Sequence, residues 1–203
     1  MARTIGSHGP RTLEAIRKAG LNLIYERGFE AMSLRQLAAE VGIQVGSLYN
    51  HISTKQDLLF DLIKGHMEDL FREFDAAQAA VAGRDAVERM RAFVDFHVTY
   101  HILRKREVFI GYSELRSLEP NHYEEIVALR RRYERALIDI LRQGMEDGVF
   151  RCGDPCVTAY GILAMLTGVC TWFRPHGRLG KDEVIAIYSD LVLGGLMGSA
   201  SGA

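Results

Sequence analysis

The sequence predicts an all-α protein of about nine helices. Apolar residues recur three and four positions apart along most of the 203 residues, as they do on the buried face of a helix. No segment shows the sustained alternation of apolar and polar residues that indicates a strand. The composition, with 48% hydrophobic and 25% charged residues, is typical of a globular protein with a hydrophobic core.

Four helices are expected before residue 79. The first ends before Gly28, because glycine readily takes the left-handed conformation that closes a helix. Ser33 and Gln36 have the spacing of a capping box and predict a second helix, which Gly42 ends. A short helix from Gln44 and a longer one after it complete this part of the chain.

A linker is expected over residues 79–85, where the sequence AAVAGRD is rich in small residues. Asp154 followed by Pro155 has the order of an N-cap residue and a first-turn proline. The helices expected after the linker cover about 84–103, 107–118, 121–147, 155–173 and 182–196.

Charge is distributed unevenly along the chain. Residues 1–55 carry seven basic and four acidic side chains, whereas the remaining residues carry 18 basic and 22 acidic ones. A basic N-terminal part on a mildly acidic body indicates that only the first part meets a polyanion such as DNA.

The cysteines and the apolar runs predict a cytoplasmic protein without a membrane partner. Cys152 and Cys156 are separated by three residues, not by the two of common redox and zinc motifs, so we expect reduced thiols and no metal site. The longest apolar run, GILAMLTGVCTWF, has 13 residues, fewer than the roughly 18 of a membrane-spanning helix.

Three residues have the spacing of a helix-turn-helix: Ala38, then Gly42 four residues on, then Leu48 six residues further. A small residue lets two helices cross closely, glycine takes the positive φ of the turn, and leucine anchors the second helix in the core. The outward face of that second helix is then available to DNA. The predicted DNA contacts are Ser33, Arg35, Gln44, Val45, Gly46, Ser47, Tyr49, Asn50, His51 and Lys55.

Within this set we expect Gln44, Ser47 and Val45 to set sequence preference. Tyr49, His51 and Lys55 are expected to contact mainly phosphates. Lys55 stands in the first turn of a helix, where a cation opposes the helix dipole. A phosphate bound at that helix end would reverse the effect. An exposed lysine without a binding role is the alternative.

The stretch FEAMSLRQLAAEVGIQVGSLYNHISTKQDLLFDLI resembles the N-terminal domain of TetR-type bacterial transcriptional regulators. The family's Gly-x-Leu-Tyr-x-His/Tyr-Phe-x-x-Lys core stands here as Gly46, Leu48, Tyr49, His51, Ile52 and Lys55, with isoleucine in place of the usual aromatic residue. The resemblance implies a homodimeric repressor that reads a palindromic double-stranded DNA operator and is released by a small-molecule effector. It implies a helix-turn-helix domain over residues 1–55 and a ligand-binding and dimerisation domain over residues 56–203, entered through a connecting fourth helix.

The resemblance places the effector among the central helices of the second domain, and a small-molecule site is an apolar cavity with a few polar groups. The predicted effector-site residues are Phe93, His97, His101, Phe109, Tyr112, Arg116, Tyr133, Thr167 and Trp172. Packing in the core is the alternative for the aromatic residues. His97 and His101, four residues apart, have a spacing that suits a shared metal as well as polar groups in a core.

The segments SELRSLEP, ALRRRYERALIDILRQGMEDGVFR and WFRPHGRLGKDEVIAIYSDLVLGGL look like those of family members that sense acyl-coenzyme A thioesters. This resemblance implies an acyl-CoA effector and no permanent cofactor. The basic runs at residues 104–106 and 130–132 would then receive its anionic end, although such runs are also common on solvated helix faces.

The last two long helices carry more apolar surface than one side can bury, and we expect them to form a two-fold dimer interface. The predicted interface residues are Met165, Val169, Val184, Ile187, Tyr188, Leu191 and Val192. Two other functions stay open: a DNA-bound scaffold that answers to no ligand, and an all-helical enzyme. Against an enzyme, the sequence has no nucleophile, base and acid at motif spacing and no glycine-rich phosphate loop.

Overall fold

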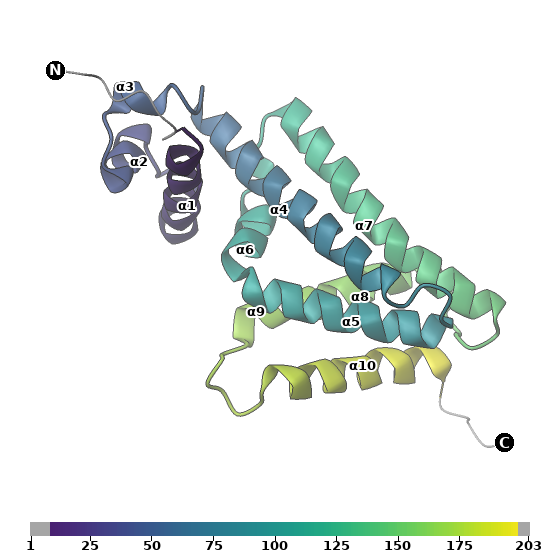
Figure 1. Cartoon of the computed structure of the whole chain (residues 1–203). Helices are drawn as coiled ribbons and strands as arrows, with labels where there is room; N and C mark the ends of the chain where they lie inside the picture. The colour runs from purple at the N-terminus through teal and green to yellow at the C-terminus, as the bar shows by residue number, and fades with distance from the viewer. Residues whose placement is uncertain (1–8, 199–203) are drawn as a thin grey trace. The chain divides into compact units, whose positions relative to one another are not determined.

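The computed structural model describes residues 9–198, and this part of the chain forms helices without any strand (Figure 1). The prediction of an all-α fold is confirmed. The helices are α1 (Gly9–Arg27), α2 (Leu34–Val41), α3 (Val45–Leu48), α4 (Lys55–Ala79), α5 (Ala86–Leu103), α6 (Lys105–Ser113), the 3-10 helix η1 (Leu115–Ser117), α7 (Pro120–Glu146), α8 (Pro155–Thr167), α9 (Val169–Trp172) and α10 (Lys181–Met197).

Local sequence signals account for several of these boundaries. The Ser33 hydroxyl accepts the Gln36 amide at 3.2 Å, and the Gln36 side chain accepts the Ser33 amide at 2.9 Å, which completes the predicted capping box. The Asp154 carboxylate caps α8 by accepting a hydrogen bond from the amide of Val157 at 2.8 Å. Gly168 separates α8 from α9 but keeps a right-handed conformation, so the two together form the helix expected from residue 155 to 173.

The chain divides into two compact units. The first contains residues 9–66 together with Arg106–Ile126, and the second contains Met67–Lys105 together with the residues from Val127 onward. This division differs from the predicted boundary at residue 55, because α4 contributes to both units. Residues 106–126, which the sequence placed in the second domain, belong to the first unit.

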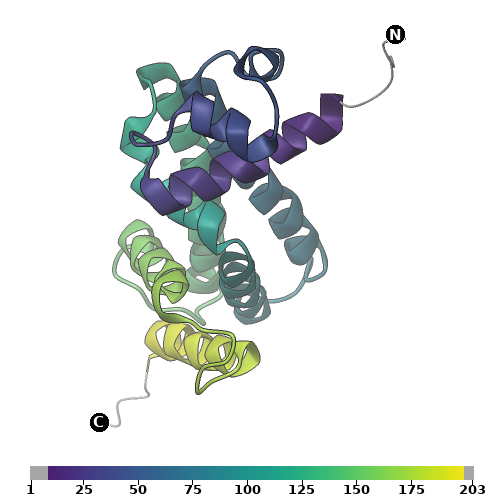
Figure 2. The same ribbon diagram turned by 90° about the vertical axis from the view of Figure 1, so that its left-hand side faces the viewer.

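The first unit has its core between α1, α2, α3 and the beginning of α4. Ile16, Ile24, Leu37, Leu48 and Leu58 are almost completely buried there. Figure 2 shows α1, in purple, with α2 beside it. Burying a leucine or isoleucine side chain contributes roughly 1.5–3 kcal/mol, so this core is what holds the four-residue α3 in place.

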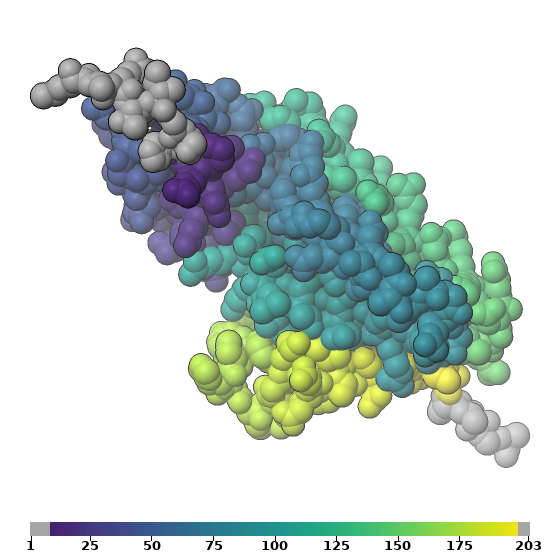
Figure 3. Space-filling model, viewed as in Figure 1, coloured from purple at the N-terminus to yellow at the C-terminus, as the bar shows by residue number. Residues whose placement is uncertain are grey.

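The second unit is built around α5, which contacts α8, α9 and α10. Met90, Phe93, Val94 and Val98 of α5 are completely buried. Their i, i+3, i+4 and i+8 spacing puts them on one face of the helix. Figure 3 shows the yellow-green connection between α9 and α10 and the yellow α10 at the surface of this unit.

Within the described residues one stretch, Pro155–Trp172, is long and apolar enough to cross a membrane, judged by length and composition alone. The sequence expectation counted only the uninterrupted apolar run, which is shorter. Core helices of soluble proteins pass the same test, so the stretch is weak evidence of a membrane span.

Candidate functional site

The turn between α2 and α3 has the geometry that the Ala38, Gly42 and Leu48 spacing predicts. Gly42 has a φ of 75°, and the Ile43 amide donates to the Ala38 carbonyl at 2.9 Å across the turn. Ala38 and Leu48 are buried, so the two helices meet through a small residue and an anchored leucine. An L-residue with a side chain is strained at this φ, which explains the glycine.

Most side chains predicted to contact DNA lie on the surface around α3. Ser33, Arg35, Gln44, Gly46, Ser47, Tyr49 and Asn50 are exposed, and Val45, His51 and Lys55 are half-buried. The Gln44 side chain makes no capping hydrogen bond to α3, so its amide is available to a base edge or a phosphate. Because α3 is anchored only through its inner face, this outer face is free to meet a groove.

Lys55 has a role that the sequence did not reveal. Its ammonium group donates to the Glu30 carbonyl at 3.1 Å and lies 4.2 Å from the centre of the Phe29 ring. Both partners belong to the segment that joins α1 to α2. Lys55 therefore ties the start of α4 to that segment, and the sequence separation of 25 residues explains why no local pattern indicated it.

A cluster of polar side chains lies inside the second unit. The His97 ring is between the Tyr133 hydroxyl and the Thr167 hydroxyl, each 3.1 Å from one ring nitrogen. The His101 ring stacks on it, with ring centres 3.7 Å apart and planes 11° from parallel. His101 Nδ1 donates to the His97 carbonyl at 2.7 Å, which fixes the position of its proton.

Burial governs the protonation of this polar cluster. Desolvation lowers the pKa of His97 well below its ordinary value, and the neighbouring His101 lowers it further. Burial also raises the pKa of the Cys170 thiol to about 11, so the thiol stays protonated and donates to the His101 carbonyl at 3.2 Å. No group of three or more metal-binding side chains converges within residues 9–198.

The predicted effector residues fall into two groups. Phe93, His97, His101, Tyr133 and Thr167 are brought together in the second unit, where Phe93 stacks on both His97 and Tyr133. The remaining predicted effector residues do not join them. Phe109, Tyr112 and Arg116 belong to the first unit, and Phe109, Tyr112 and Trp172 are 48%, 54% and 48% exposed.

The basic runs predicted to receive an anionic ligand are partly engaged by acidic side chains. Arg104 pairs with Glu73 at 3.1 Å, and Arg132 pairs with Asp75 at 3.7 Å. These pairs are solvent-exposed, so each is weak and can be exchanged for another anion.

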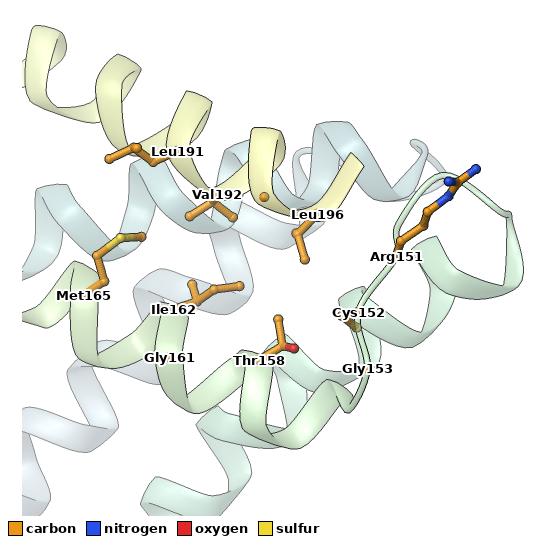
Figure 4. Close-up of a pocket in the computed structure, with 11 residues that line it drawn as sticks. Arg151, Cys152, Gly153, Thr158, Gly161, Ile162, Met165, Leu191, Val192 and Leu196 are labelled. Atoms are coloured by element: carbon orange, nitrogen blue, oxygen red, sulfur yellow. The ribbon is translucent and has the colours of Figure 1, made fainter. Parts of the chain in front are cut away.

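An apolar groove of about 420 Å³ lies between α8 and α10 (Figure 4). Of the predicted dimer residues, Met165, Leu191 and Val192 line it, Ile187 is exposed beside it, and Tyr188 is half-buried. Val169 and Val184 are buried inside the unit and present little surface to a partner. Val192 borders the groove but is itself only 4% exposed.

The sequence prediction missed two exposed residues of α8, Val157 and Tyr160, which are 69% and 53% exposed. Their spacing of three places them on one helix face, and this pattern could have revealed them.

The fold and its exposed α3 define a helix-turn-helix DNA-binding protein with a helical second unit. Residues 16–62 match the family described as bacterial regulatory proteins of the tetR family, and residues 83–196 match the tetracyclin repressor-like C-terminal domain. The chain belongs to the TetR family of bacterial transcriptional regulators, and its relatives in that family are regulators and not enzymes.

Relatives of known name and structure agree over nearly the whole chain. The transcriptional repressor KstR2 of Rhodococcus jostii is 28% identical over 95% of this chain and 94% of its own. A tetR-family regulator from Rhodococcus RHA1 superposes with a TM-score of 0.86, at 27% identity over 94% of this chain and 99% of its own. AibR, solved in complex with isovaleryl coenzyme A and operator DNA, gives a TM-score of 0.79 at 28% identity, over 92% and 98% of the two chains.

Proposed function

We propose that this protein is a cytoplasmic, homodimeric repressor that reads a palindromic operator through α3 and releases it when an acyl-CoA thioester binds. The observation that carries the DNA assignment is the exposed polar face of α3, presented by a helix-turn-helix that buried Ala38 and Leu48 anchor in the core. In this proposal Gln44, Ser47 and Val45 set sequence preference, and Tyr49 and His51 contact phosphates.

Apolar surface that one copy leaves uncovered supports the proposed dimer. Only 28% of the apolar stretch Pro155–Trp172 is buried. Val157 and Tyr160 of α8 and Ile187 and Leu191 of α10 are all exposed. Exposed apolar side chains gathered on two helices are typical of an interaction site, and a two-fold pairing lets one surface serve both copies.

Two observations support a small-molecule effector. The aromatic interior around Phe93 and Tyr133 contains a short chain of hydroxyl and imidazole groups, which is the kind of lining that orients a ligand. The related AibR binds isovaleryl coenzyme A, and its operator as well. An acyl chain would enter this interior, and Arg104 or Arg132 would exchange its acidic partner for the anionic end of the ligand.

Release requires the ligand to bind the form of the protein that has left DNA more tightly than the DNA-bound form. A preference of about a hundredfold corresponds to about 2.7 kcal/mol and is enough to loosen a nanomolar complex. Helices α4 and α7 each contribute residues to both units as one continuous helix, so each offers a covalent route for such a change.

The test begins with selection of genomic fragments that the full-length protein binds, followed by fluorescence anisotropy on a labelled copy of the selected site. Isovaleryl-CoA, longer acyl-CoA esters, free coenzyme A and the free acids are then titrated against the complex. Release by the thioesters at concentrations where free coenzyme A and free acids have no effect supports the proposal. Equal release by an acid and its thioester would contradict the thioester assignment.

A regulator that binds DNA without any effector is the second candidate, and the polar cluster favours it, because His97, Tyr133 and Thr167 already hydrogen-bond to one another. Release by none of these compounds would favour that candidate. A reporter gene placed behind the operator separates repression from activation.

A further inference from the structure

The segment that joins α1 to α2 is held from outside the helix-turn-helix. The backbone N–H of Phe29 donates to Glu114 Oε1 at 3.2 Å, although the two residues are 85 positions apart. Glu114 immediately precedes η1, and its second oxygen accepts the Ser117 hydroxyl at 2.9 Å. One carboxylate therefore binds a backbone amide of the DNA-binding unit and is itself oriented by a neighbour.

This contact is the end of a longer attachment along α1. Arg106 of α6 donates to the Asn22 side chain and lies over the Tyr25 ring, 5.7 Å from its centre. Phe109 meets the same ring edge-on at 5.1 Å. Helix α6 thus contacts α1 through Arg106 and Phe109, and Glu114, just after α6, binds the segment that leads to α2.

Residues 114–117, which we call the η1 connector, also hold the beginning of α4. Gln56 Nε2 donates to the Ser117 carbonyl at 2.8 Å, one residue after Lys55. Lys55 in turn binds the carbonyl of Glu30, on the segment whose amide Glu114 binds. In the α1–α2 segment, the Phe29 N–H is therefore bound by the Glu114 carboxylate and the Glu30 C=O by the Lys55 ammonium group. Both binding groups lie outside α1 and α2.

Charge makes the Glu114 contact stronger than an ordinary backbone hydrogen bond. Phe29 is buried, so its amide would lose a partner that water does not easily replace if the carboxylate were removed. Gly28 has a φ of 81° and lies directly before this amide, which turns the chain toward the carboxylate. Glu114 is therefore bound to the chain at the point where it turns toward α2.

We infer that Glu114 is a positioning residue for operator recognition. Its carboxylate, on the η1 connector, sets the orientation in which α2, and with it α3, meets DNA. The inference rests on the proposed DNA-binding function. It names a residue that touches no DNA itself and that lies 59 positions beyond Lys55, the last residue predicted to contact the operator.

The test compares Glu114→Met, which removes the acceptor, with Glu114→Gln, which keeps an oxygen acceptor but removes the charge. Glu124→Met, at an exposed glutamate of α7, is the matched control for loss of charge. Each full-length variant is titrated with the selected operator and with a scrambled duplex of equal length. Non-specific binding depends mainly on phosphate charge, so the ratio of the two affinities reports on positioning.

Glu114→Met is expected to lower the operator affinity about tenfold, as an unpaired buried amide would, and to leave the scrambled-duplex affinity near that of the control. Glu114→Gln should restore most of the ratio. Amide hydrogen exchange at Phe29 should accelerate about tenfold in the Met variant and little in the Gln variant. If Glu114→Met does not fold, Glu114→Asp replaces it, since the shorter side chain withdraws the carboxylate and keeps its charge.

An unchanged affinity ratio in Glu114→Met, or the same loss in Glu124→Met, would overturn the inference. A lower melting temperature with an unchanged ratio would do so as well, because Glu114 would then be structural only. Failure of the wild-type protein to prefer any operator over the scrambled duplex would instead overturn the proposed function.

Discussion

Acidification should destabilise this protein through His97. The ring is completely enclosed, and both nitrogens are engaged by hydroxyl groups of Tyr133 and Thr167. Its pKa in the folded state is lowered, by burial first and by His101 second, whereas the unfolded chain has the ordinary value. Between these two pKa values the unfolded state binds more protons, so the stability conferred by neutral His97 is present above the unfolded pKa and is lost as the pH falls.

The size of this effect follows from linkage for one site. With an unfolded-state pKa of 6.5 and a ring that stays neutral in the folded state, the free energy of unfolding falls by about 1.4 kcal/mol between pH 7.5 and pH 5.5. Below the lowered pKa of the folded state this contribution no longer changes with pH. A loss of this size is a substantial fraction of the roughly 5–15 kcal/mol by which most domains are stable.

Urea unfolding at both pH values, at one fixed protein concentration, measures the loss in the wild-type protein and in His97→Gln. The variant should be less stable at pH 7.5, because a hydroxyl loses its partner, but should lose about 1.4 kcal/mol less on acidification. His176→Gln, in the exposed connection between α9 and α10, is the control and should keep the full loss. Equal losses in the wild-type protein and in His97→Gln would refute the assignment of this pH dependence to His97.

Three further substitutions test the proposed DNA-binding surface, the proposed dimer surface and the cap of α2. Lys55→Ala should weaken binding to all DNA sequences alike and reduce the salt slope by about one unit, while an unchanged slope in salt titrations would assign Lys55 to the α1–α2 segment alone. Leu191→Glu should dissociate the dimer in sedimentation velocity and abolish tight operator binding, and a monomer that still bound the full operator tightly would contradict the interface. Ser33→Ala should lower the free energy of unfolding by about 1 kcal/mol in denaturant titrations, since it removes the α2 cap; no change would mean that the cap is not needed.

The geometry of the helix-turn-helix was largely predictable because its determinants are local. The Ser33 capping box, the positive φ of Gly42 and the burial of Leu48 all follow from spacings of a few residues. Short-range steric and hydrogen-bonding rules decide each of them, and one sequence contains all the information they need. The resulting α3 is short, but its outer face is exposed as expected.

Contacts between distant segments could not be predicted in this way. Glu114 is an ordinary acidic residue in the sequence, and nothing near it indicates that it binds the amide of Phe29. Phe109 and Tyr112 have the apolar character of residues that line an interior, yet both are exposed on α6. Their environment depends on which helix meets α6, and periodicity carries no information about the neighbour.

The helices α8 and α10 show the same limit from another side. Val184 and Leu191 are seven residues apart in α10, so they lie on nearly the same face of the helix. Both are apolar, but Val184 is buried within its own unit and Leu191 is 57% exposed. An apolar stripe on a helix predicts that its side chains are buried. It does not indicate whether the same chain or a second copy buries them. The groove that Gly161 and Gly195 help to line supports the proposed interface, because it leaves apolar side chains of α10 beside a hollow that the described residues do not fill. A helix with apolar residues on more than one face therefore predicts an interface only when the fold shows which of these faces remains exposed to solvent.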